Sequence, residues 1–175
     1  MSRLSSNNRE DIPFLFTFQR TFKIKTVQNI LHYLKDLKDY QEYLDRLRKY
    51  KKKYDFLLYG YCLMPNHVHM VGEITPASNL SAFMRALLRS YTAYFNRKYK
   101  KEGHLWQGRF KSKIIIKDRY LFDCINYIEA NPIKANMVNN IHEYKWSSYS
   151  ERVLGETGKE RIVNDLTMRD EGTVS

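Results

Sequence analysis

Alternating and helically spaced apolar residues predict the elements of the first half of the chain. The segment from Phe14 to Phe22 (FLFTFQRTF) is aromatic and alternating, which is typical of a strand. A long helix is predicted from Thr26, as its cap, through about Tyr50, with apolar positions Ile30, Leu31, Leu34, Leu37, Leu44 and Leu47. Two strands are then predicted from Phe56 to Leu63 and from His67 to Ile74, joined around Met64-Pro65-Asn66.

The second half is predicted to continue with a helix, a strand and a helix. Ser78-Asn79 opens a helix with a full apolar stripe, and Leu105 to Ile116 is a β-like stretch rich in basic and aromatic residues. Asp118 is expected to cap a third helix, which Pro132 ends because proline disfavours helical geometry in the residue before it. This order predicts an α+β fold, with helices packed on a mainly antiparallel sheet. The apolar stripe of the second helix is Leu80, Phe83, Met84, Leu87, Leu88, Tyr91, Tyr94 and Phe95.

Length and composition indicate one domain that is large enough to bury a hydrophobic core. The chain has 175 residues and is 43% hydrophobic, which excludes the intrinsically disordered class. We expect the domain to span residues 1–153. The weakly patterned residues 154–175 are expected to form a partly mobile tail.

Charge and aromatic content favour a nucleic-acid partner. Lys and Arg number 30 against 19 Asp and Glu, a net charge of +11, and 14 tyrosines are interleaved with the basic residues. Cys62 and Cys124 both lie in apolar segments, which fits a reducing compartment. The polar N-terminus and the absence of any long apolar run lead us to expect a cytoplasmic protein without a membrane segment.

Two pairs of polar residues have the spacing expected of a metal site with a nucleophile beside it. His67 and His69 are two positions apart in a predicted strand, so both imidazoles point to one face. Tyr127 and Asn131 are four apart on the third helix and share its face, and Asn131 directly precedes Pro132, where its amide oxygen is free. Two imidazoles and one amide oxygen leave coordination positions of the ion open, as a catalytic metal site requires. Mn²⁺ suits this mixed nitrogen and oxygen set, and Mg²⁺ is the commoner ion in cells.

If the third helix packs beside the histidine strand, Tyr127 would face a phosphate held by the metal. The metal would act as a Lewis acid, and attack by the tyrosine hydroxyl would give a covalent phosphotyrosine. Because the bond energy is retained, this chemistry suits strand transfer. From the residues alone, however, the histidines also fit an ordinary polar surface, and Tyr91, Tyr94 and Tyr120 are equally eligible nucleophiles.

Four blocks of the sequence resemble a known family. Residues 61–69 (YCLMPNHVH) resemble the HUH motif of the single-tyrosine transposases. Residues 103–112 (GHLWQGRFKS), 127–135 (YIEANPIKA) and 144–149 (YKWSSY) are similar to blocks of the REP-associated tyrosine transposases. The blocks occur in the family's order and the resemblance covers roughly residues 12–150, which makes the set far more specific than any single motif.

The resemblance implies a fold and a mechanism. It implies a ferredoxin-like, RRM-like core with the histidines on a central strand, a Mg²⁺ or Mn²⁺ ion bound by His67, His69 and Asn131, and Tyr127 as the nucleophile. Members cleave single-stranded DNA near imperfect hairpins and leave a 5′-phosphotyrosine and a free 3′-hydroxyl. Related dimeric transposases take the tyrosine from the partner subunit, whereas the REP-associated branch implies a monomer, with a homodimer as the alternative.

Basic and aromatic residues are candidate DNA contacts, namely Arg85, Arg89, Arg97, Trp106, Gln107, Arg109, Lys111 and Lys113. The alternation of Trp106 and Phe110 fits core packing equally well. Tyr144, Trp146 and Tyr149 are expected to anchor the C-terminal segment on the core. Two other functions stay open: a domesticated module that binds hairpin DNA or RNA without cutting it, and a metal-dependent nuclease that uses activated water.

Overall fold

A four-stranded antiparallel sheet lies at the centre of the computed structural model, which describes residues 15–21, 33–74, 79–106, 110–115, 118–155 and 161–165. The strands β1 (Leu15–Thr21), β2 (Phe56–Met64), β3 (His67–Ile74) and β4 (Lys111–Ile115) are arranged in the order β2-β3-β1-β4. The main helices are α1 (Leu37–Lys53), α2 (Leu80–Tyr99), α3 (Asp118–Glu129) and the single turn α4 (Asn131–Lys134). The predicted order of strands and helices is confirmed.

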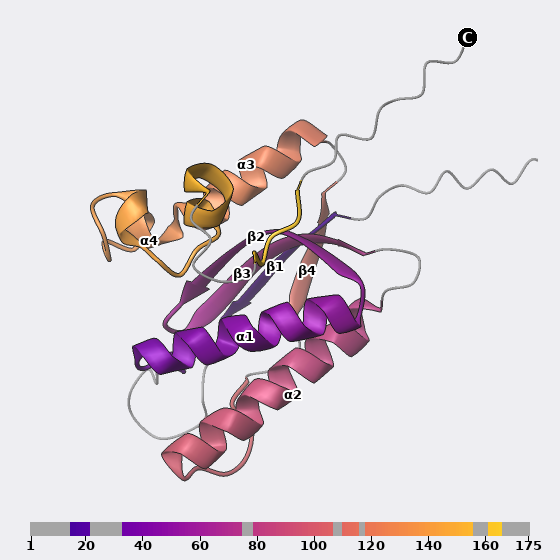
Figure 1. The fold of residues 1–175 in the computed structure, drawn as a ribbon, viewed down its shortest axis with the longest axis vertical. Coiled ribbons are helices and arrows are strands. Elements are labelled where there is room, and N and C mark those ends of the chain that lie inside the picture. Colours follow the sequence, from indigo (N-terminus) through magenta and orange to yellow (C-terminus); the bar gives the residue numbers. More distant parts are fainter. Residues whose placement is uncertain are drawn as a thin grey trace, which may run out of the picture.

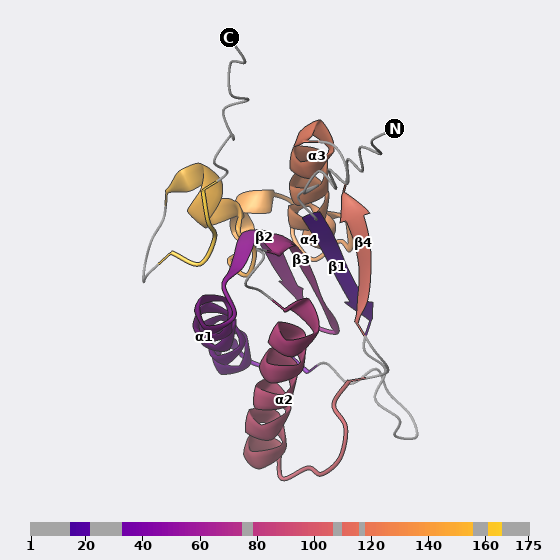
Figure 2. The same cartoon turned by 90° about the vertical axis from the view of Figure 1, so that its right-hand side faces the viewer.

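Helices cover both faces of the sheet. Strand side chains alternate, so β3 directs Val68 and Met70 to one face and Val71 to the other. Val68 and Met70 join the cluster formed with α1 and α2, whereas Val71 packs against α3. Figures 1 and 2 show α1 and α2 on one side of the sheet and α3 and α4 on the other. The side of the sheet on which a β3 residue lies therefore decides which helices it meets.

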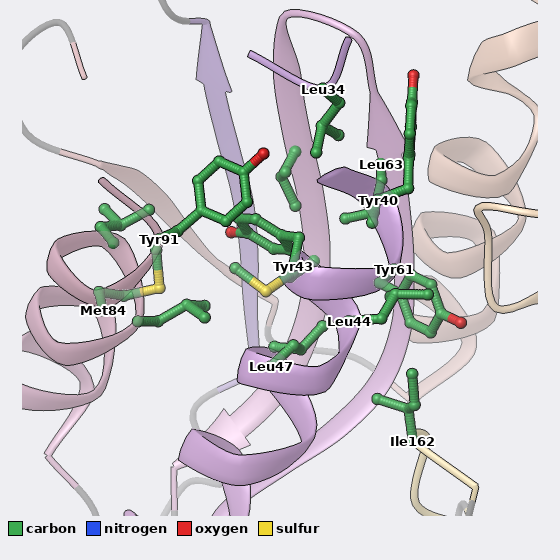
Figure 3. Packing of buried hydrophobic residues seen from close by; sticks show 14 of the residues in the cluster. Leu34, Tyr40, Tyr43, Leu44, Leu47, Tyr61, Leu63, Met84, Tyr91 and Ile162 are labelled. Atoms are coloured by element: carbon green, nitrogen blue, oxygen red, sulfur yellow. The ribbon is translucent and has the colours of Figure 1, made fainter. Parts of the chain in front are cut away.

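The larger core lies between the sheet, α1 and α2, and it is rich in tyrosine. Figure 3 shows Tyr43 and Leu47 of α1 in one cluster with Met84 and Tyr91 of α2. The C-terminal Ile162 belongs to the same cluster and is 1% exposed. No helix in the described part of the chain has the length and apolar character needed to cross a membrane.

The first helix begins later than its apolar spacing predicts. Asp36 is the N-cap and forms a capping box with Asp39, so α1 starts at Leu37. Tyr33 and Leu34 are not helical, because their backbone N–H groups donate to the carbonyl of Pro65 in the β2–β3 turn, at 3.1 and 3.4 Å. The predicted start at Thr26 lies outside the described residues, and helix through residues 33–36 is wrong.

Two other boundaries also differ from the prediction. The strand predicted from Leu105 begins only at Lys111, because residues 105–106 pack beside α2, where the Trp106 indole N–H donates to the Leu88 carbonyl at 2.9 Å. Asp118 is the first residue of α3 and not its cap. The helix ends at Glu129, before Pro132, which lies in the first turn of α4, where its missing N–H is tolerated.

Short elements complete the C-terminal part of the domain. They are a 3₁₀ turn η1 (Ile141–Glu143) and a π-helical turn η2 (Ser150–Leu154). Between them, the Trp146 carbonyl accepts from the Leu63 N–H at 2.8 Å, and the Ser148 N–H donates to the Tyr61 carbonyl at 2.9 Å. Tyr144 is buried and its hydroxyl donates to the Leu63 carbonyl at 2.5 Å. Residues 144–148 therefore cover the outer edge of β2, and the expected anchoring is confirmed for Tyr144.

Candidate active site

His67 and His69 lie side by side on β3, an inner strand of the sheet. Their ring centroids are 4.6 Å apart and the ring planes meet at 84°. Both share a face with Val71, because strand positions two and four apart point the same way. Since Val71 packs against α3, the two imidazoles open onto the side of the sheet that α3 covers.

Burial keeps both imidazoles neutral. It lowers the pKa of His67, and burial, followed by the nearby His67, lowers the pKa of His69 to about 3. The Nδ1 of His67 lies 2.7 Å from the Oδ1 of Asn66, which only accepts hydrogen bonds. Nδ1 is therefore the donor, and the Nε2 of His67 presents a lone pair. A neutral imidazole with a free ring nitrogen is the form that binds a metal ion.

The Nε2 of His69 is a buried polar atom with no hydrogen-bond partner among the described residues. Such an atom is costly unless something binds it, typically about 1–3 kcal/mol. Within the described part of the chain no group of three His, Cys, Asp or Glu side chains comes together, so a third ligand from these residues would be of another type. The donor chemistry at the pair thus fits a metal ion that also takes an amide oxygen.

Asn131 can supply that oxygen. Its side-chain nitrogen Nδ2 donates to the Ile128 carbonyl at 3.1 Å, and its Oδ1 accepts no hydrogen bond within the described residues. The prediction that Asn131 lies on the third helix with Tyr127 is wrong, because α3 ends at Glu129 and Asn131 begins the separate turn α4 after Ala130. The turn follows the helix that packs against β2 and β3. The predicted free amide oxygen is therefore present on the histidine side of the sheet.

Tyr127 lies on an exposed flank of α3. The buried side of this helix consists of Leu121, Ile125 and Ile128, which pack on the sheet, and the Tyr127 side chain is 54% exposed. Gly60 of β2 permits a close approach, because a Cβ there would lie 3.0 Å from the Cγ2 of Ile125. Tyr127 and the two histidines thus belong to the same side of the sheet, with the tyrosine hydroxyl open to a large ligand.

The rival tyrosines on α2 are placed elsewhere. Tyr91 and Tyr94 are buried in the core that α1 and α2 form on the opposite face of the sheet. The Tyr91 hydroxyl donates to the Tyr33 carbonyl at 2.8 Å, and the Tyr94 hydroxyl donates to Asp39 at 3.0 Å. Both hydroxyls are engaged and lie across the sheet from the histidines. The side chain of Tyr120 lies outside the described part of the structure.

Glu129, the last residue of α3, holds the tyrosine helix in place, a role that the sequence patterns did not predict. Its carboxylate is fully buried and accepts from the Ser148 hydroxyl at 2.6 Å. The Ser148 Oγ in turn accepts from the Tyr61 N–H of β2 at 2.9 Å. These contacts fasten the end of the tyrosine helix to the sheet. The signal in the sequence is a charged residue in line with the apolar positions Leu121 and Ile125.

The three predicted arginines of α2 lie in a groove on the other side of the molecule. Arg85, Arg89 and Arg97 are exposed and line this groove between α1 and α2, together with Tyr50 and Tyr54. None of the three has an acidic partner among the described residues, whereas Arg46 in the same groove pairs with Glu42. The groove belongs to the α1 and α2 layer, across the sheet from the side that holds the histidine pair.

The other predicted DNA contacts have different outcomes. The Trp106 ring packs edge-on against Tyr33 at 4.9 Å between centroids, which is the core packing that the sequence left open. Gln107 and Arg109 lie outside the described residues. Lys111 and Lys113 lie on the edge strand β4, in register with Gln19 and Thr17, and their side chains lie outside the described part of the structure. For these residues DNA contact stays a prediction.

Comparison with known proteins identifies the family. A family model described as "Transposase IS200 like" matches residues 32–131, a range that contains His67, His69, Tyr127 and Asn131. The chain is 26% identical over 113 residues to a Haemophilus influenzae protein named as a REP-associated tyrosine transposase. That match covers 59% of this chain and 64% of the relative, so the chain spans less than two thirds of its length.

A solved structure has the same fold. It is the structure of a REP-associated tyrosine transposase bound to a REP hairpin, and it superposes with a TM-score of 0.66. The two chains are 20% identical, and the likeness covers 95% of this chain and 94% of the other. The resemblance to the REP-associated tyrosine transposases is confirmed. The match over residues 32–131 shows that the chain belongs to the IS200-like transposase family.

Proposed function

We propose that this protein cleaves and rejoins single-stranded DNA near hairpins, through a 5′-phosphotyrosine on Tyr127 and with the help of a divalent metal ion. The observation that carries the proposal is the buried, unpartnered Nε2 of His69, beside His67 and on the side of the sheet that the tyrosine helix covers. Family membership supports the class of reaction. The order β4-β1-β3-β2 supports assignment of the core as ferredoxin-like.

The metal ligands in this proposal are the Nε2 atoms of His67 and His69 and the Oδ1 of Asn131. We propose Mn²⁺ or Mg²⁺, because two neutral nitrogens and one amide oxygen suit Mn²⁺ and leave positions for phosphate oxygens. When bound, the ion supplies Lewis-acid polarisation of the scissile phosphate and offsets its developing charge. Asn66 contributes by holding His67 in the tautomer whose Nε2 is free.

Tyr127 performs the exchange of bonds. Its hydroxyl oxygen attacks the phosphorus, so that the tyrosine O–P bond forms as the bond from phosphorus to the 3′ oxygen breaks. The electron pair leaves with the 3′ oxygen, which takes up a proton, and the phenol proton passes to water. One phosphodiester replaces another, so a free 3′-hydroxyl can reverse the step and rejoin a strand.

The tyrosine is proposed to act on the histidines of its own chain. The helix α3 packs against β2 and β3 of the same molecule, and Glu129 fastens its end to that sheet through Ser148. This arrangement supports a monomer, because no exchange of the helix between subunits is needed to bring Tyr127 to the histidine side.

The arginine groove is proposed to bind a second part of the same DNA. The nucleotides at the histidines cannot also lie between α1 and α2, because the sheet separates the two surfaces. Exposed, unpaired arginines beside tyrosines suit the phosphates of a hairpin stem. Contacts from Gln107, Arg109, Lys111 and Lys113 to the single-stranded flank remain part of the proposal.

A covalent adduct provides the test. The protein is incubated with a labelled DNA hairpin that has single-stranded flanks, together with Mn²⁺ or Mg²⁺, and is then denatured. We expect a labelled protein band whose modified peptide contains Tyr127. The band should be absent in Tyr127→Phe and retained in the matched control Tyr149→Phe, a tyrosine that stands beside His142 instead.

Two other results would contradict the proposal. Hairpin binding without an adduct under either metal would indicate a non-cleaving binding module. Cleavage that persists in Tyr127→Phe would indicate a nuclease that activates water.

A further inference from the structure

The ammonium group of Lys134 lies over the ring of Tyr127. Its Nζ is 3.6 Å from the ring centroid, a close cation–π contact. Lys134 is exposed and forms no ion pair within the described residues, so its charge is not committed to a carboxylate there. Tyr127 is itself 54% exposed, and its ring stacks on no other aromatic ring among the described residues.

The backbone holds Lys134 in place for this contact. Its N–H donates to the Ala130 carbonyl at 3.1 Å, the helical bond that closes the single turn α4 directly after α3. Pro132 is buried, and its carbonyl accepts from the Met137 N–H at 2.9 Å. Helical side chains lean towards the N-terminus, so the Lys134 stem reaches back over Tyr127. The turn that presents Asn131 thus also presents the ammonium group.

We propose that Lys134 is a positioning residue that holds the Tyr127 ring in one orientation for attack on the phosphate. An exposed tyrosine otherwise rotates freely about its Cα–Cβ bond, and an in-line displacement requires one direction of approach. The ammonium group occupies one face of the ring and leaves the hydroxyl and the other face open. The inference rests on the proposed role of Tyr127 as the nucleophile.

The contact itself is tested on the full chain without DNA or metal. With carbon-13-labelled tyrosine, the ring signals of Tyr127 are identified by their loss in Tyr127→Phe. Lys134→Met, which keeps the length of the side chain but removes its charge, should shift these signals, and Lys134→Arg should leave them close to the wild-type position. Lys145→Met removes an exposed lysine outside the turn and should not move them. Unchanged Tyr127 signals in Lys134→Met would overturn the inference.

The effect on the reaction is tested by single-turnover adduct formation with saturating hairpin DNA. We expect Lys134→Met to slow adduct formation about tenfold, because the hydroxyl is presented in the attacking orientation less often. The Kd for the hairpin without metal should stay unchanged, and Lys134→Arg should restore most of the rate. A general loss of folding would instead lower the rate, raise the Kd and appear in circular dichroism of Lys134→Met.

The outcomes separate the two proposals. If the wild type forms an adduct and Lys134→Met forms it at the same rate, the positioning role is wrong and the proposed function stands. If the wild type forms no adduct with either metal, the proposed function itself fails.

Discussion

Arg152 and Glu129 form an ion pair beneath the helix that carries Tyr127, with 2.6 Å between the Arg152 Nη2 and the Glu129 Oε2. The carboxylate is fully buried, whereas the arginine side chain is 21% exposed and reaches it from the turn η2. Arg152 also donates to Asn126 one turn earlier on α3, at 2.9 Å. A residue far along the chain thus fixes the end of the tyrosine helix, close to Asn131.

Removal of Arg152 should destabilise the fold strongly. In Arg152→Met the Glu129 carboxylate remains buried and keeps Ser148 as its hydrogen-bond donor but loses its cation, so we expect a loss of about 3 kcal/mol in the free energy of unfolding. Urea denaturation measures this. The matched control is Arg161→Met, which breaks an exposed pair with Asp165 and should cost less than about 0.5 kcal/mol. Equal losses in both variants would contradict the role of the buried pair.

Metal binding should depend on Asn66 as well as on the ligands themselves. Asn66→Ala removes the acceptor that holds the Nδ1–H of His67, so we expect Mn²⁺ affinity to fall about tenfold in calorimetry. His69→Ala should abolish binding, and a chelator should abolish adduct formation by the wild type. His142→Ala, a change at an exposed histidine, serves as the control. Full Mn²⁺ affinity in His69→Ala would show that the ion binds elsewhere.

If the arginine groove binds DNA phosphates, hairpin affinity should depend on salt through its arginines. Arg85→Ala, Arg89→Ala and Arg97→Ala should each weaken hairpin binding and reduce the slope of log K against log salt by about 1. Lys38→Ala removes an exposed cation of α1 outside the groove and should leave the slope unchanged. Fluorescence anisotropy across a salt series gives both quantities. Loss of adduct formation with undiminished hairpin binding would instead place these arginines in the chemistry.

Most of the sheet could be predicted from the chain, because the period of two is a local property of a strand. The same period is enough to predict that His67 and His69 share one face. The start of α1 could not be predicted in this way. Its apolar spacing extends backwards past Leu34, but the N–H of that residue donates to Pro65, a contact between distant positions that a local pattern does not contain.

The candidate site could also be predicted only in part. Spacing alone indicates Tyr127 with Asn131, but it leaves Tyr91 and Tyr94 as rivals. Only the fold separates them, because it buries both rivals in the core with α1 and α2 on the opposite face of the sheet. The same limit applies to Arg85. Its positive charge suggests contact with DNA, but the local sequence does not show on which face of the sheet its helix packs.

Acid should weaken the contact between the two helices that lie across the sheet from the active site. Asp39 at the start of α1 is fully buried, and the Nζ of Lys98 on α2 lies 2.6 Å from its Oδ1. Burial raises the pKa of Asp39, but hydrogen bonds from Lys98 and Tyr99 outweigh it and hold that pKa below its ordinary value. The ionised form is therefore the one that the folded state favours.

The sign of the pH dependence follows from this pKa. Because the pKa is lower in the folded than in the unfolded chain, the contribution of Asp39 is fully present above its ordinary value of 3.8 and is lost as the pH falls below it. Asp39→Asn should therefore cost about 2–3 kcal/mol at neutral pH, with a smaller deficit below about pH 4. Asp45→Asn, at a partly exposed pair with Arg48, should cost less than about 1 kcal/mol. Urea denaturation at a series of pH values checks both variants. If the loss of unfolding free energy in Asp39→Asn stays constant with pH, Asp39 contributes through packing and not through its charge.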